Sequence, residues 1–187
     1  MKDKQYIELL RERLLPERFT HSLNVAQSAV YLAEKYGEDK DKAYIAGLLH
    51  DVMKNSDDTE QLEMIERYGI SMTELEKKNK KLWHAMSAPG YLLYELGEKD
   101  EDLLNAVRYH TTGRAGMSLL ERIIFIADYI SDERDYNGVE IMRELADKSL
   151  EDAMLFALKF TLQKLSSQNM CIHPDCLGCY NELIINR

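Results

Sequence analysis

The stretch Gly-Leu-Leu-His-Asp-Val-Met-Lys at residues 47–54 places an imidazole and a carboxylate among apolar residues. Its pattern predicts a largely buried helix that carries His50 and Asp51. A buried carboxylate is costly unless it is paired or bound to a metal ion. Asp128 poses the same problem within Ile-Ile-Phe-Ile-Ala-Asp-Tyr-Ile at residues 123–130. Neutral histidines do not supply the missing positive charge, whereas bound metal ions would.

Histidines and aspartates recur along the chain in one ordered series. It uses four of the five histidines and runs His21, His50-Asp51, His84, His110 and Asp128. Imidazole together with carboxylate suits iron, manganese and zinc. A closed structural zinc site takes about four ligands, mostly Cys and His. Six candidate ligands therefore predict two metal ions and hydrolytic chemistry.

Each of these residues, taken alone, has a plainer interpretation. His84, which follows Trp83, could be an ordinary hydrogen-bonded histidine, and the same holds for His21 and His110. Asp128 could be the structural partner of an arginine such as Arg108 or Arg122. It is their joint order, and the neighbours of each, that favour a metal site.

Apolar residues at helical spacing dominate the chain, and strand signals are nearly absent. Pro16 fits the opening of a helix, Gly37 its end and Ser56 an N-cap, while Pro89 predicts a kink or a break. The predicted helices cover about residues 6–14, 16–37, 39–54, 57–68, 82–96, 100–109, 117–130, 138–146 and 150–165, with a short one after residue 174. This pattern predicts one all-α domain over residues 1–187.

Composition narrows the classes of function. The chain has 187 residues with 24 Lys and Arg against 33 Asp and Glu, a net charge of −9. This balance argues against broad nucleic-acid binding, which needs a basic face, but it permits a small phosphate substrate in a locally positive pocket. No apolar run reaches the roughly 18–20 residues that span a bilayer, and the first residues do not resemble a signal peptide. A cytoplasmic protein without membrane contact is expected.

The three cysteines, Cys171, Cys176 and Cys179, lie close together near the end of the sequence. An odd number argues against a disulfide framework. With His173 they could form a small zinc site, but the second half of such a motif is missing, so three reduced thiols are favoured. We assign His173 a structural role because the ligand series does not need it.

Four longer strings sharpen the interpretation of the series. They are Arg-Phe-Thr-His-Ser at residues 18–22, the stretch at 47–54, His-Thr-Thr-Gly-Arg at 110–114, and Ile-Ala-Asp-Tyr-Ile at 126–130. The order His, His-Asp, Asp resembles the metal-dependent HD-domain phosphohydrolase superfamily, and His84 and His110 resemble its dinuclear subset. Together the strings resemble the bacterial YqeK-type family of symmetrical diadenosine tetraphosphate hydrolases. The resemblance covers about residues 18–134, with weaker similarity at 172–174.

The resemblance implies an all-α HD fold, a homodimer and two metal ions, iron first, with manganese or zinc as alternatives. The implied metal ligands are His21, His50, Asp51, His84, His110 and Asp128, with Asp51 as the bridging ligand. His50, Asp51 and Lys54 form the implied catalytic centre. The implied substrate contacts are Arg18, Lys54, Thr111, Gly113, Arg114 and Arg134. One departure lies just before Arg134, where Ser-Asp-Glu at residues 131–133 replaces the usual Glu-Pro.

Some of these substrate contacts also have a plainer interpretation. Arg18 and Lys54 lie near predicted helix ends and could be solvated charges, and Arg114 could be an exposed loop residue. The predicted reaction is attack by a hydroxide held between two metals, which splits diadenosine tetraphosphate into two ADP. The alternatives are another nucleotide substrate, such as a nucleoside mono- or triphosphate or a guanosine alarmone, and a non-catalytic nucleotide-binding module. A cyclic-dinucleotide substrate would call for a Gly-Tyr-Pro signature, which the sequence lacks.

Overall fold

Helices account for every regular element that the structure describes. It is a computed structural model that covers residues 2–187, with side chains from residue 4 onward. The helices are α1 (Lys2–Arg13), α2 (Pro16–Tyr36), α3 (Lys40–Leu49), α4 (Asp58–Arg67), α5 (Glu74–Lys78), the 3-10 helix η1 (Lys80–Leu82), α6 (Trp83–Tyr94), α7 (Glu101–Tyr109), α8 (Leu119–Ile130), α9 (Val139–Lys148), α10 (Leu150–Ser167) and α11 (Pro174–Ile185). The predicted all-α single-domain fold is confirmed.

The predicted helix over residues 39–54 is too long. The structure ends α3 at Leu49, with His50 as its C-cap, and the chain then turns through residues 50–55. The Nδ1 of His50 donates to the carbonyl of Gly47 at 2.7 Å, and the amides of Val52 and Lys54 bond three residues back. These tighter bonds replace the helical pattern, and they place His50 and Asp51 beyond the helix instead of inside it.

Three smaller expectations also change. Asp57, rather than Ser56, caps α4, because its carboxylate accepts from the amide of Glu60. Helix α6 continues unbroken through Pro89. The short helix α5 was not expected; it is too brief and polar for apolar periodicity, and it is held by the capping box of Thr73 and Glu76.

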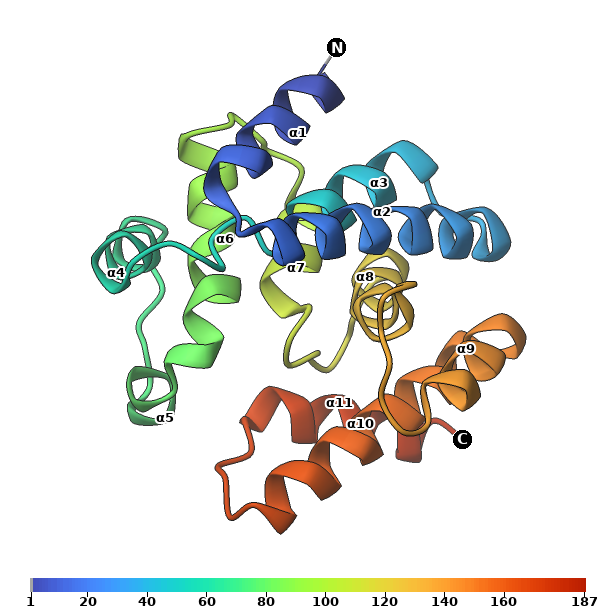
Figure 1. The fold of residues 1–187 in the computed structure, drawn as a ribbon. Coiled ribbons are helices and arrows are strands. Elements are labelled where there is room, and N and C mark those ends of the chain that lie inside the picture. Colours follow the sequence, from blue (N-terminus) through green and yellow to red (C-terminus); the bar gives the residue numbers. More distant parts are fainter. Residues whose placement is uncertain (1) are drawn as a thin grey trace.

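The close approach of α2 and α3 organises one side of the core. A Cβ atom added at Gly47 would lie 2.9 Å from the Cα of Ala26 and 3.2 Å from the Cβ of Ala29. Helix α8 is central, and Ile123, Ile124 and the other apolar residues around them are buried. Figure 1 shows α8 between the α2–α3 pair and the helices α9 and α10, with α4, α5 and α6 on the opposite side. This arrangement points helix ends and one helix face toward the molecular centre.

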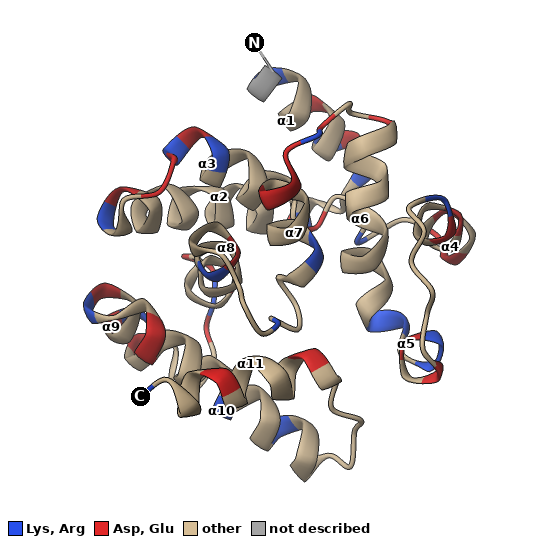
Figure 2. Ribbon diagram, turned by 180° about the vertical axis from the view of Figure 1, so that it is seen from behind, with Lys and Arg blue, Asp and Glu red and all other residues tan. Residues whose placement is uncertain are grey.

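Charged residues of both signs lie on the outer helices. Both α5 and α9 carry basic as well as acidic residues, coloured blue and red in Figure 2. Among residues 2–187, none of the helices is both long and apolar enough to cross a membrane.

Candidate metal centre

Two of the six predicted ligands are placed by the same local structure. His50 is the C-cap of α3 and His110 is the C-cap of α7. Each ring lies back over its own helix end, where Nδ1 donates at 2.7 Å to the carbonyl three residues earlier, of Gly47 and of Val107 respectively. Both rings are buried, and both therefore direct Nε2 into the molecular interior.

His21 reaches the same region from the first turns of α2. Its Nε2 lies 3.3 Å from the Nε2 of His50 and 2.9 Å from the Oδ1 of Asp128 on α8. Its Nδ1 is hydrogen-bonded to the carboxylate of Glu133, in the turn after α8. Both nitrogens of this buried ring thus have a carboxylate neighbour.

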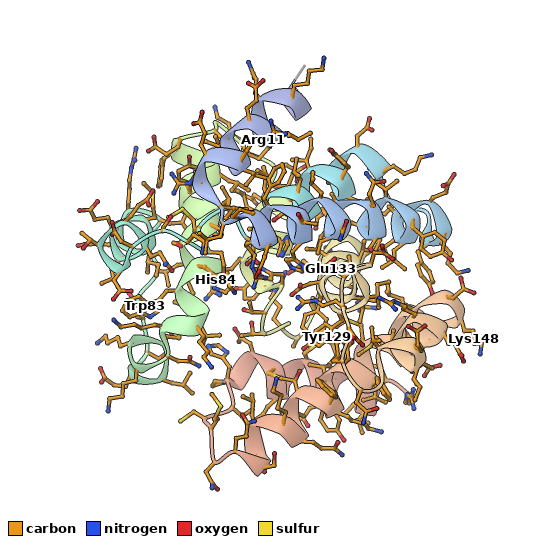
Figure 3. All side chains as sticks on the ribbon, viewed as in Figure 1. Arg11, Trp83, His84, Tyr129, Glu133 and Lys148 are labelled. Atoms are coloured by element: carbon orange, nitrogen blue, oxygen red, sulfur yellow. The ribbon has the colours of Figure 1, made fainter. Side chains whose placement is uncertain are left out.

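Asp51 lies between two pairs of histidines. Its Oδ2 is 3.5 Å from the Nε2 of His50 and 3.9 Å from that of His21. Its Oδ1 faces the other way and is 3.2 Å from the Nε2 of His84 and 3.6 Å from that of His110. The structure therefore brings all six residues of the series together, and His84 and Glu133 both lie near the middle of the molecule in Figure 3.

The two aspartates do have cationic partners in the protein. Arg18 donates to the Oδ2 of Asp51 at 2.9 Å, and Arg134 pairs with the carboxylate of Asp128. The suggested partners Arg108 and Arg122 are wrong, because they pair with Glu76 and Glu151. Arginines of the protein therefore supply part of the positive charge that was expected from bound metal ions.

These contacts keep both carboxylates ionised. Burial opposes ionisation of Asp51, but nearby His50 and the ring nitrogens of His110 and His84 hold its pKa well below the usual range. Burial likewise opposes ionisation of Asp128, and the nearby ring of His21 and the charge of Arg134 lower its pKa. Two charged oxygen ligands are thus available at neutral pH.

Burial lowers the pKa of two basic groups of the cluster. Burial lowers the pKa of His84 to about 4 despite the opposing effect of Asp51. Burial also lowers the pKa of Lys54, whose Nζ lies 3.0 Å from the Nε2 of His84. The neutral imidazole of His84 has a lone pair that can bind a metal.

The donor set fits divalent metal ions. Because a carbonyl oxygen can only accept, Nδ1 carries the proton in His50 and His110, and the Nε2 of each neutral ring is a bare lone pair. The Nε2 atoms of His84 and His110 face one another at 3.3 Å, and the buried Oδ1 of Asp51 lacks a hydrogen-bond partner. Converging lone pairs repel unless a cation lies among them, so this arrangement indicates divalent metal binding.

Known proteins of similar sequence share this architecture. Residues 18–133 match the HD domain family. A Halalkalibacterium halodurans protein named "Bis(5'-nucleosyl)-tetraphosphatase, symmetrical" is 39% identical over 97% of this chain and 96% of its own. A Bacillus subtilis protein of the same name is 36% identical over 98% of both chains. This chain belongs to the YqeK-type branch of the HD-domain family.

A solved structure agrees with the placement in this family. It is a Clostridium acetobutylicum protein described as a predicted HD superfamily hydrolase involved in NAD metabolism. It superposes with a TM-score of 0.95 at 36% identity, and covers 98% of this chain and 97% of its own. The similarity extends through the C-terminal helices, beyond the residues that match the HD domain model.

A solvent-facing hollow of about 370 Å³ opens beside the histidine cluster of this HD domain. Three of the expected substrate contacts, Arg18, Lys54 and Arg134, line it together with His21. Arg18 and Arg134 are both partly engaged with aspartates of the cluster. The interpretation of Arg18 and Lys54 as merely solvated charges is therefore wrong, since both contact Asp51 or His84.

The other three expected contacts do not line this hollow. Arg114 forms two hydrogen bonds with the buried carboxylate of Glu121, at 2.6 and 2.8 Å, so it is not a free loop residue. The positive φ of 63° at Gly113 favours glycine, and a Cβ there would approach the Sγ of Cys179 at 3.3 Å. The buried Oγ1 of Thr111 has no hydrogen-bond partner. The contacts of Gly113 and Arg114 thus explain their place in this loop through packing and pairing within the protein.

Several residues of the site were missed in the sequence. Glu133 accepts hydrogen bonds from His21, from Asn24 at 2.6 Å and from Ser131 at 2.8 Å. Arg143, on α9, donates to the carbonyls of Ile130, Ser131, Asp132 and Arg134 and so fixes the turn after α8. The sequence did contain a signal for Glu133. At residues 131–133 it departs from the usual Glu-Pro and places a carboxylate directly before Arg134.

The cysteines stay apart from this site. All three are free, with Cys171 exposed and Cys176 and Cys179 buried. The candidate metal clusters among residues 2–187 do not include them or His173. His173 instead caps α11 and contacts Glu76 at 3.3 Å, which agrees with a structural role.

Proposed function

We propose that this protein hydrolyses dinucleoside polyphosphates and splits diadenosine tetraphosphate symmetrically into two ADP. The observation that carries the proposal is the position of Asp51, whose two oxygens face two different histidine pairs beside a hollow lined with cations. Water attacks one of the two central phosphorus atoms, and the bond to the oxygen that bridges them breaks. Full-length relatives named as symmetrical bis(5'-nucleosyl)-tetraphosphatases support this choice of substrate.

The six-residue cluster is proposed to hold two metal ions, with Asp51 shared between them. His21, His50 and Asp128 would belong to one side, since His21 lies next to both others, and His84 and His110 would belong to the other. When bound, the ions would lower the pKa of water and neutralise charge on the phosphoryl group. The mixture of imidazole and carboxylate ligands without thiolate suits iron, which we propose as the resident metal, rather than a metal that prefers sulfur.

Cations of the protein bind and orient the polyphosphate in this proposal. Arg18 and Arg134 are held at the hollow by their aspartate partners, and each keeps further N–H donors for phosphate oxygens. Lys54 lines the same hollow, with its Nζ 3.0 Å from the Nε2 of His84, and would donate hydrogen bonds to phosphate oxygens. Thr111, Gly113 and Arg114 would contact the substrate from outside this hollow.

The proposal extends to the whole protein. Residues 18–134 would form the catalytic core, and the helices up to residue 187 would complete the domain. We propose a homodimer, which the family resemblance implies, and a location in the cytoplasm. The acidic composition agrees with a protein that does not bind nucleic acid.

One experiment tests these points together. The protein is purified under anaerobic conditions without added metal and is analysed for iron, manganese and zinc. Its molar mass is measured by light scattering, and it is then incubated with a panel of nucleotides. We expect two iron ions per chain, a mass of twice 21.7 kDa, and ADP as the sole product from diadenosine tetraphosphate. The panel includes nucleoside mono- and triphosphates and a guanosine alarmone.

The variant Asp51→Asn removes the shared carboxylate with little change in shape. It is expected to lose most of the metal and to keep less than about one hundredth of the activity. Asp132→Asn is the matched control, because it removes an exposed carboxylate near the site and should change neither. Full turnover with stoichiometric metal in Asp51→Asn, or slow turnover of every dinucleoside polyphosphate by the wild type, would refute the proposal.

A further inference from the structure

Glu133 has a role that the proposed ligand set does not explain. It lies in the turn after α8, and 32% of its side chain remains exposed to the hollow. Its carboxylate accepts hydrogen bonds from His21, Asn24 and Ser131. Such convergence of three donors holds the carboxylate in one position.

His21 differs from the other ligand histidines in what its Nδ1 contacts. The Nδ1 atoms of His50 and His110 donate to neutral backbone carbonyls of their own helices. His21 lies in the first turns of α2, and the partner of its Nδ1 is the charged side chain of Glu133 from another element. The orientation of His21 therefore depends on a side chain that a substitution can remove.

The charge of Glu133 is unfavourable for the proposed substrate. Glu133 lines the same hollow as Arg18 and Arg134, where a polyphosphate would lie. A carboxylate at this place repels phosphate, so binding of substrate does not account for it. A favourable contact with His21 does account for it.

We propose that Glu133 is a positioning residue that holds His21 as a metal ligand. By accepting from Nδ1 it fixes the tautomer in which Nε2 is unprotonated and points toward Asp51 and Asp128. A carboxylate partner also makes the imidazole a more basic ligand. The inference rests on the proposed metal site and identifies a residue outside the ligand set that governs metal affinity.

The test compares Glu133→Gln with Glu17→Gln in the metal-free protein. Both substitutions remove one negative charge from the same hollow, but none of the described contacts joins Glu17 to a histidine. The dissociation constant for Mn²⁺ alone is measured by chelator competition, without substrate. We expect Glu133→Gln to weaken Mn²⁺ binding by about 10- to 100-fold and Glu17→Gln to leave it unchanged.

Kinetics with saturating metal separate positioning from a general loss of structure. Both variants should have a KM for diadenosine tetraphosphate equal to or below that of the wild type, because a repulsive charge is gone. Only Glu133→Gln should require more metal to reach its full kcat. Added to His21→Ala, the Glu133→Gln change should weaken Mn²⁺ binding by less than twofold further, because the ligand it positions is absent.

Three results would overturn the inference. Wild-type affinity for Mn²⁺ in Glu133→Gln means that the carboxylate does not position His21. An equal loss in Glu17→Gln means that only the charge of the hollow matters. A full further loss in the His21→Ala background means that Glu133 acts through another group. If the wild type itself binds no Mn²⁺, the proposed metal site fails together with the inference.

Discussion

At the scale of single residues, burial separates the reactive groups of this chain from the inert ones. Asp51 and Asp128 are kept ionised by arginines and histidines at the site. At Cys176 and Cys179 burial has the larger effect and raises the pKa of each thiol to about 11. The same low exposure thus produces charged carboxylates in one place and neutral thiols in another.

This contrast predicts the alkylation pattern of the native protein. Iodoacetamide at pH 8 should label Cys171 within minutes, because this thiol is exposed. Cys176 and Cys179 should react at least about 100-fold more slowly, since a pKa two units above normal reduces the thiolate by about that factor. Their rates should rise about tenfold per pH unit up to pH 10. Peptide mass spectrometry at set times measures all three, and rapid labelling of Cys176 in folded protein would contradict the assignment.

At the scale of elements, the contact of α2 with α3 determines where two ligands lie. His21 belongs to α2 and His50 ends α3, and the two helices touch at Gly47 and Ala26. The carbonyl of Gly47 also accepts from His50. Packing and ligand orientation therefore depend on the same backbone position.

The substitution Gly47→Ala should lower the free energy of unfolding by roughly 1–3 kcal/mol, because its Cβ meets the backbone of Ala26 at 2.9 Å. It should also weaken metal binding by moving His50 away from His21. Gly178→Ala, in helix α11, is the matched control. There the added Cβ lies 3.8 Å from the Cβ of Ala115, and stability should stay the same or rise by up to about 1 kcal/mol.

Urea denaturation of both metal-free variants measures these differences. An unchanged midpoint for Gly47→Ala would show that α2 and α3 can separate without cost, contrary to the packing described above. Loss of stability in Gly178→Ala to the same extent would mean that any added methyl group is disruptive, so that the contact at Gly47 is not special.

At the scale of the whole molecule, the metal site joins residues from five helices or helix ends that are distant in the sequence. Its residues come from α2, from the ends of α3 and α7, from α6 and from α8. A metal ion that binds only the folded chain therefore stabilises the arrangement of all these helices at once.

Removal of metal should lower the melting temperature. At free metal 100 times its dissociation constant, binding adds about 2.7 kcal/mol to stability. For a chain of this length, that corresponds to a shift of roughly 5–10 °C. Calorimetry with and without a chelator measures it, and Asp51→Asn is the control that should show no shift. A chelator-independent transition in the wild type would argue against bound metal.

The sequence was sufficient for the fold class and for the six-residue series, because long amphipathic helices and polar residues in apolar runs are local signals. It was insufficient where the cause lies far away. Glu133 contacts His21, from which it is separated by 112 positions in the sequence. Arg114 pairs with Glu121, which the sequence alone would suggest only as a helix-capping residue. Helix α3 ends where the ring of His50 donates a hydrogen bond to the carbonyl of Gly47 in the same helix. The spacing of apolar residues does not reveal such a bond.

The twin helix ends at His50 and His110 restrict coordination chemistry in a specific way. A histidine can bind a metal through either ring nitrogen, so two such ligands allow four linkage isomers. With both Nδ1 atoms bonded to Gly47 and Val107, only the isomer that uses Nε2 twice is open. The backbone thus selects the donor atom before any metal arrives, and metal ions bound at these two positions have one linkage isomer.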